Sequence, residues 1–136
     1  MEATIEHLGE VKFAAVARGH RVICDQPVEN AGANSGMSPP EFLLVSLGTC
    51  AGYYAVQYLK ARGLATQGLR VRVEADKAAA PARLAGFRIE VQAPAGLEER
   101  HRAGVLRAVQ SCLIHNTLLS SPAIQTAVEV PVEATA

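Results

Sequence analysis

Three cysteines are the residues of this sequence best suited to covalent chemistry. They stand at positions 24, 50 and 112, and Cys112 begins a Cys-x-x-His spacing with His115. A thiolate can act as a nucleophile, a redox centre or a metal ligand, although most free cysteines are simply small buried side chains. An odd number of cysteines in a chain without a secretory signal favours a reducing compartment. We therefore expect a cytoplasmic protein, in which such cysteines are more often catalytic, redox-active or metal-bound than structural.

Residue type alone leaves the role of each cysteine open. Cys112 and His115 could supply half of a zinc site, but a structural zinc site needs four ligands, and the other histidines have no paired spacing. No phosphate-binding loop or dinucleotide-binding motif is present either, so we expect no metal and no cofactor. Cys50 follows the helix start at Ser38 by 12 residues, beyond the first turn in which the helix dipole acts. A reactive Cys50 therefore needs a cation from another part of the fold.

The stretch 38–63, with Cys50 at its middle, predicts one long helix. Ser38 and Glu41 have the capping-box spacing S-x-x-E, and Gly63 suits the left-handed residue that ends a helix. Apolar side chains point in every direction around the axis between these ends, which predicts a helix buried on all sides. The run is slightly short for a membrane span and holds small and polar residues, so we expect it to pack on a sheet of this chain and on a second copy rather than in a membrane.

Composition favours a single globular domain over residues 1–136. The chain is 49% hydrophobic and 4% aromatic, and its net charge of zero argues against nucleic acid or an anionic membrane as the main partner. Alternating apolar residues predict strands before and after the long helix, and a 3.6-residue pattern predicts a second helix. The sum is a two-layer α+β domain. The expected strands are 3–17 with a turn at 9–10, 21–24, 69–77, 87–92 and 128–132, and the second helix is 98–111.

Two motifs together carry a resemblance to a known family. The stretch 37–50 (MSPPEFLLVSLGTC) is followed, 62 residues after Cys50, by the stretch 112–118 (CLIHNTL) that begins at Cys112. This pair resembles the OsmC/Ohr family of osmotically inducible protein C and organic hydroperoxide resistance proteins, and the resemblance covers almost the whole chain. It implies an OsmC-like two-layer fold with antiparallel strands packed on a long central cysteine-bearing helix. It also implies an intertwined homodimer whose sites lie where the subunits meet.

The resemblance implies a function in the oxidative stress response. Cys50 would be the peroxidatic cysteine that reduces an organic hydroperoxide to an alcohol, and Cys112 would resolve its sulfenic acid as a disulfide. A thiol such as dihydrolipoamide would then reduce the disulfide. Leu47, Tyr53 and Tyr54 lie near Cys50 on the helix and would form an apolar lining for the substrate.

The match to the family's activating residues is incomplete. Arg18 is the nearest match to the family's arginine, but counting back from Cys50 places Pro40 where the family has a glutamate. Glu41 comes one residue late and lies on the opposite side of the helix from Cys50, since each residue turns the helix by about 100°. With Leu113 where relatives often have proline, the chain resembles the OsmC-like subgroup. The alternative function is a non-catalytic dimer that binds a small apolar or thiol-reactive ligand at its interface.

Overall fold

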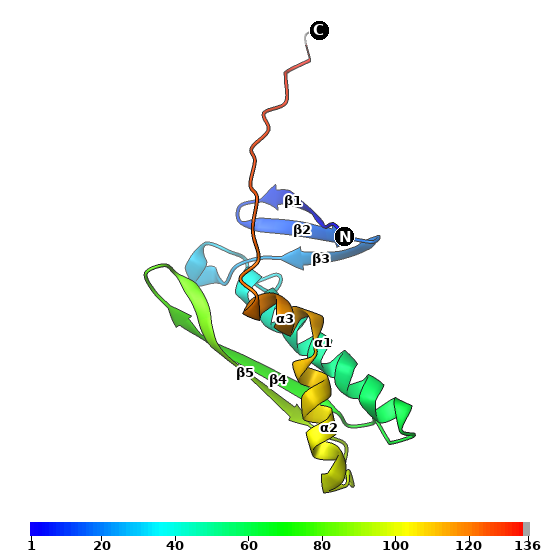
Figure 1. Ribbon diagram of the computed structural model, residues 1–136. Helices are drawn as coiled ribbons and strands as arrows, with labels where there is room; N and C mark the ends of the chain where they lie inside the picture. Colours follow the sequence, from blue (N-terminus) through cyan, green and yellow to red (C-terminus); the bar gives the residue numbers. More distant parts are fainter. Residues whose placement is uncertain (135–136) are drawn as a thin grey trace.

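The computed structural model describes residues 1–134 as an α+β fold arranged around one long helix (Figure 1). One antiparallel sheet has the strand order β1-β2-β3, and the second is the antiparallel hairpin β4-β5. The α+β class predicted from the sequence is confirmed. The elements are β1 Thr4–Gly9, β2 Lys12–Ala17, β3 His20–Cys24, the 3-10 turn Val28–Asn30, α1 Pro39–Ala61, β4 Arg70–Ala78, β5 Arg83–Gln92, α2 Glu99–Gln110 and α3 Leu113–Leu119.

The N-terminal sheet is a meander of short strands joined by tight turns. Gly9 and Glu10 turn the chain between β1 and β2, and Arg18 and Gly19 turn it between β2 and β3, all four with positive φ. Every residue of β1 is exposed, and Ala14 of β2 is the sheet's one fully buried apolar residue. The sheet lies at the N-terminal end of α1 (Figure 1), and its apolar residues Ile5, Leu8, Val16 and Val22 are exposed in this chain.

Helix α1 begins and ends at the residues that the sequence predicts. Ser38 is the N-cap, and its carbonyl accepts the Phe42 N–H at 3.1 Å. The predicted capping box is only partly formed, because the Ser38 hydroxyl donates to the Glu41 carboxylate at 3.0 Å instead of accepting a backbone N–H. A carboxylate is a strong acceptor, and the two prolines after Ser38 have no N–H to offer. At the other end Gly63 has a φ of 65° and donates to the Lys60 carbonyl.

Burial of α1 follows one stripe rather than the whole circumference. Its buried residues recur every four positions, which places them on one face of the helix. Val45 and Tyr53 on other faces are 41% and 59% exposed. The predicted all-round burial is therefore wrong for the single chain, because the elements of one copy cover only part of the helix. The buried stripe is Leu47, Ala51, Ala55 and Leu59.

Two glycines let β4 approach α1 closely, as the small residues of this helix predict. A Cβ at Gly48 would stand 2.9 Å from Val73 Cγ2, and one at Gly52 would stand 3.5 Å from Val71 Cγ2. α1 is also long and apolar enough to span a membrane by length and composition, and 28% of its most hydrophobic window is buried in this chain. The central helix of a folded domain meets the same criteria, and the β4 contacts fit that description.

Helix α2 packs against α1 at a third glycine. A Cβ at Gly104 would overlap the ring and hydroxyl of Tyr58, whose oxygen lies 3.2 Å from His101 Nδ1. His101 is half-buried by this contact. Leu106 of α2 lies outside this contact and is 57% exposed. The core shared by α1 and α2 consists of Ala51, Ala55, Leu59, Val105 and Val109.

The loop between β3 and α1 is organised around a buried carboxylate. Asp25 is 1% exposed and accepts hydrogen bonds from the N–H groups of Gln26, Ala33 and Ser35 and from the Ser35 hydroxyl at 2.6 Å. These bonds, the Ser35 hydroxyl first, hold the pKa of Asp25 far below its usual value. The loop that leads into the cysteine-bearing helix is therefore a fixed structure.

The C-terminal segment does not form the strand predicted at 128–132. Residues 121–134 have no regular secondary structure and run away from the rest of the chain (Figure 1). Val128, Val130 and Val132 are all more than four-fifths exposed. The alternating pattern suits a strand, but the rest of the described chain offers this segment no neighbouring strand with which to pair.

Candidate active site

Cys50 and Cys112 are brought together by the packing of three helices. Cys50 lies in the middle of α1, and Cys112 lies in the connection between α2 and α3, both of which pack on α1. Cys50 is close enough to raise the pKa of the Cys112 thiol, and no disulfide joins the two residues. Two thiols separated by 62 residues of sequence therefore form one site.

The two thiols differ in exposure and in proton affinity. Cys112 is fully buried, whereas Cys50 is partly exposed. Burial is the main reason that the pKa of Cys112 is raised, and the hydrogen bond and charge of Cys50 raise it further. The N–H groups of His115, at 3.5 Å from the sulfur, and Ile114 act in the opposite direction but do not cancel these effects. A reagent from solution therefore meets Cys50 first, and Cys112 stands behind it as a protonated thiol.

The three predicted lining residues have different surroundings. Leu47 is 2% exposed and belongs to the buried stripe of α1, so it does not face an open site in this chain. Tyr53 is exposed, and its ring meets that of Tyr54 edge to face at 5.5 Å. Tyr54 also lines an open hollow of about 540 Å³ beside α3. The rest of that hollow is lined by Ser111, Leu113, Asn116, Thr117, Ser120 and Pro122.

Arg18 and Glu41 are not placed beside Cys50 in this chain. Arg18 is exposed in the turn between β2 and β3, and Glu41 accepts the hydrogen bond from Ser38 described above. Within residues 1–134, no hydrogen bond or ion pair links either of them to Cys50. The activating cation that a reactive Cys50 requires is thus not supplied by Arg18 of the same copy.

Cys24 and Asp25 stand at the junction of the N-terminal sheet with this helix. Cys24 ends β3 and bridges to Met37, and its pKa is raised by burial and by the charges of Asp25 and Glu41. No function was predicted for Asp25 from the sequence. The signal that could have found it is an aspartate followed by a loop rich in glycine, serine and asparagine. Within the described residues, no group of three or more His, Cys, Asp or Glu side chains is placed to hold a metal ion.

Comparison with known proteins identifies the family to which the chain belongs. The profile of the family described as OsmC-like protein matches residues 32–127, which is more than half of the chain and includes both Cys50 and Cys112. The chain belongs to the OsmC-like family. No curated protein matches its sequence. The OsmC-like match begins within the loop before α1 and covers α1, the β4-β5 hairpin, α2 and α3.

Solved structures of low sequence identity share the OsmC-like fold. An osmotic stress induced and detoxification response protein from Psychrobacter arcticus has a TM-score of 0.78 at 20% identity, over 85% of each chain. An OsmC like protein from Mycoplasma pneumoniae has a TM-score of 0.74 at 21% identity, over 88% of this chain and 86% of the other. An organic hydroperoxide resistance protein OsmC from Legionella pneumophila has a TM-score of 0.60 at 14% identity, over 88% of each chain. These likenesses concern the fold.

Proposed function

We propose that this OsmC-like protein is a thiol-dependent peroxidase that reduces organic hydroperoxides to alcohols in the cytoplasm. The observation that carries the proposal is the pairing of a partly exposed Cys50 with a buried Cys112 whose pKa Cys50 helps to raise. Family membership supports a redox role, as does the similarity to a Legionella protein named for organic hydroperoxide resistance. The accessible thiol suits attack on substrate, and the sheltered thiol suits resolution.

The chemistry follows in two steps. The Cys50 thiolate attacks one oxygen of R–O–O–H, so that an S–O bond forms, the O–O bond breaks, and the alkoxide leaves and takes a proton to become the alcohol. Cys50 is thereby oxidised to a sulfenic acid. The Cys112 thiol loses its proton and attacks the sulfenic sulfur, which releases hydroxide as water and forms the Cys50–Cys112 disulfide. An external dithiol such as dihydrolipoamide, itself oxidised to a cyclic disulfide, returns both cysteines to thiols.

We further propose that the working protein is a homodimer. Val45 and Tyr53 on α1 and Val128, Val130 and Val132 of the C-terminal segment are exposed in the single chain, and large exposed apolar areas mark interaction sites. A second copy seated on α1 would bury this surface. The same copy would bring its own β2–β3 turn, and hence its Arg18, toward Cys50, which forms no hydrogen bond with Arg18 of its own chain.

One observation favours a second candidate function. Arg18 does not reach Cys50 in the same copy, and with an unreactive Cys50 the protein would be a non-catalytic dimer that binds a small apolar or thiol-reactive ligand at its interface. The two functions differ in one measurable result. Only a peroxidase consumes hydroperoxide with loss of two thiols per chain.

The test is a single turnover of fully reduced protein with cumene hydroperoxide. We expect one equivalent of cumyl alcohol per chain and the loss of two of the three free thiols. Cys50→Ser should abolish turnover, Cys112→Ser should leave a sulfenic acid that dimedone traps, and Cys24→Ser should behave as the wild type. Unchanged thiols and unconsumed hydroperoxide in the wild type would overturn the peroxidase and leave the binding protein.

A mixing experiment tests the role of Arg18 in the dimer. Arg18→Gln and Cys50→Ser proteins are each expected to be inactive, while subunit exchange should create heterodimers with one complete site. A random one-to-one mixture would then recover about a quarter of the wild-type rate, since half of the dimers are mixed and each has one working site of two. If the mixture stays as inactive as its components while exchange is verified by mass, Arg18 does not act across the interface.

A further inference from the structure

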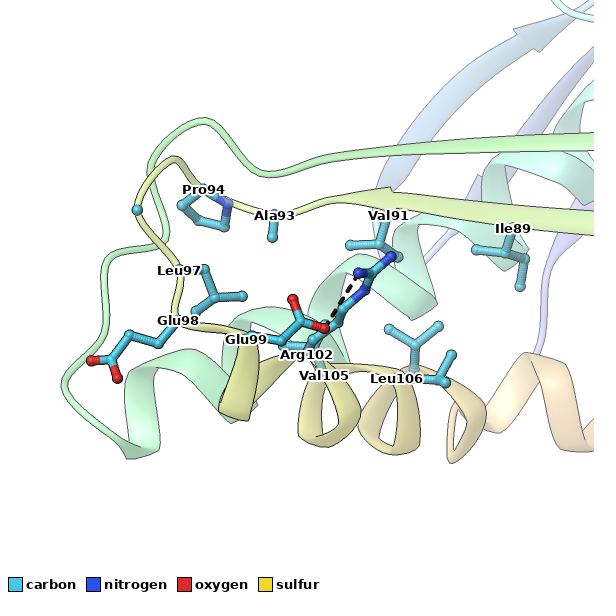
Figure 2. Close-up of a pocket in the computed structure, with 12 residues that line it drawn as sticks. Ile89, Val91, Ala93, Pro94, Leu97, Glu98, Glu99, Arg102, Val105 and Leu106 are labelled. Atoms are coloured by element: carbon cyan, nitrogen blue, oxygen red, sulfur yellow. Dashed lines mark hydrogen bonds and ion pairs between the residues drawn. The ribbon is translucent and has the colours of Figure 1, made fainter.

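An apolar groove separates β5 from α2 and contains none of the cysteines. Its volume is about 560 Å³, which falls in the range of small-molecule sites. In Figure 2, Ile89 and Val91 project from β5 toward Val105 and Leu106 of α2, and the space between them is open on one side. The remaining lining residues are Ala93, Pro94, Gly96, Leu97, Glu98, Glu99, Arg102 and Val109.

The walls of this groove are aliphatic and partly exposed to water. Leu106 is 57% exposed although it faces the apolar side chains of β5, and Ile89 and Val91 are only half-buried. Well-packed proteins fill such a space with their own side chains, because a gap forfeits dispersion contacts and leaves apolar surface in water. An aliphatic chain inserted between β5 and α2 would remove this surface from water.

Arg102 stands at the mouth of the groove and extends along the opening toward Val91 (Figure 2). Among residues 1–134, its one ion pair is a 3.4 Å contact from Nη1 to Glu99 Oε1, which leaves most of its N–H donors without a partner there. A guanidinium has five N–H donors and matches a carboxylate in two parallel bonds. Both side chains are highly exposed, so this pair contributes little and is easily exchanged. Glu98 pairs with Arg100 at 2.9 Å and, in Figure 2, points away from the groove.

We propose that this groove binds an aliphatic carboxylate, with the alkyl chain between β5 and α2 and the carboxylate on Arg102. The groove complements such a ligand in polarity and in charge. Its apolar walls suit the alkyl chain, and Arg102 at its end suits the carboxylate, as its exposed ion pair with Glu99 illustrates. The ligand's carboxylate replaces Glu99, which then returns to water. This site is separate from the Cys50–Cys112 pair and does not depend on peroxidase activity.

The test is calorimetric binding of decanoate to the intact protein, below its critical micelle concentration, with 1-decanol as the neutral analogue. Decanoate is expected to bind and to shift the amide resonances of residues 89–91 and 105–106. Arg102→Gln should weaken binding several-fold, the loss of one exposed charge pair. Glu99→Gln should tighten it several-fold, because a competing carboxylate is removed. Arg100→Gln is the matched control on the same helix turn, and it should leave the affinity unchanged.

Glu99→Gln and Arg102→Gln are expected to change decanoate affinity in opposite directions, which a general loss of folding would not do. Both side chains are exposed, so both variants should retain the far-ultraviolet circular dichroism and melting temperature of the wild type. No decanoate binding, equal binding of decanol, or unchanged affinity in Arg102→Gln would each overturn the proposal. Dissociation of the protein into monomers by Leu106→Lys, without decanoate binding to the wild type, would assign the groove to a second copy of the chain instead.

Discussion

The contact of Gly104 with Tyr58 predicts that Gly104→Ala destabilises the protein, although Gly→Ala usually stabilises a helix. In an exposed helix interior, Gly→Ala stabilises by about 1 kcal/mol because alanine loses less backbone entropy on folding. At Gly104 the new methyl group would overlap the Tyr58 ring, which is also held by the His101 contact and by the Arg62 guanidinium stacked 3.7 Å from its centroid. The tyrosine therefore cannot move aside without losing contacts.

The magnitude follows from three contributions. Overpacking of a core site costs roughly 1–3 kcal/mol, and loss of the hydrogen bond between Tyr58 and His101 costs about 1 kcal/mol. The helix propensity of alanine offsets about 1 kcal/mol of this. Gly104→Ala should therefore destabilise the protein by about 2 kcal/mol. With Tyr58→Leu, which removes the ring atoms that the methyl group would meet, the same change should stabilise by up to about 1 kcal/mol.

The assay is a double-mutant cycle by urea denaturation at one fixed protein concentration, followed by far-ultraviolet circular dichroism. Ala103→Gly is the matched control, because Ala103 is exposed on the same helix and its substitution should cost about 1 kcal/mol in both backgrounds. If Gly104→Ala is as destabilising in the Tyr58→Leu background as in the wild type, or if it stabilises the wild type, overlap with the Tyr58 ring is refuted as the cause.

Three further outcomes follow from the structure. The hydrogen bonds that lower the pKa of Asp25 stabilise the folded protein at any pH above the aspartate pKa of the unfolded chain, about 3.9. This stabilisation is lost as the pH falls below that value. Melting temperatures should therefore drop more steeply below about pH 4 in the wild type than in Asp25→Asn. Gly48→Val should destabilise by about 1–3 kcal/mol, and Val73→Ala should reduce that loss in an equilibrium unfolding series. Since burial raises the pKa of Cys112 above that of an ordinary thiol, which is about 8.5, disulfide formation from oxidised Cys50 should still accelerate above that pH, as measured by quenched alkylation; a plateau below about pH 8 would contradict this.

Local signals predicted most of the elements. Ser38 and Gly63 marked the ends of α1 within two residues, and period-two alternation located β4 and β5, because capping and amphipathic patterns depend on a few neighbouring residues. The same local pattern predicted a strand at 128–132, where the described chain has none. Strand formation depends on a partner strand, and the sequence does not show where that partner lies.

The candidate active site was also predicted only in part from the sequence. The spacing of the motifs around Cys50 and Cys112, together with the resemblance to a family, was enough to predict that the two cysteines act together. It did not show that Leu47 is buried in the core or that Asp25 organises the loop before α1, since both depend on contacts between segments. Likewise, the groove beside Arg102 depends on how far apart β5 and α2 lie, and a local sequence pattern does not predict that spacing.

The sequence by itself determined a long apolar helix with a central cysteine, strands on either side of it, and a second cysteine at the end of a later helix. These features depend on residue type and on periods of two and 3.6 residues. Tertiary structure decided which thiol is open to solution and which is enclosed, that Arg18 lies away from Cys50 of its own chain, and which faces of α1 are left uncovered. Burial, proton affinity and charge partners are properties of residues distant in sequence and adjacent in space, so only the folded chain specifies them.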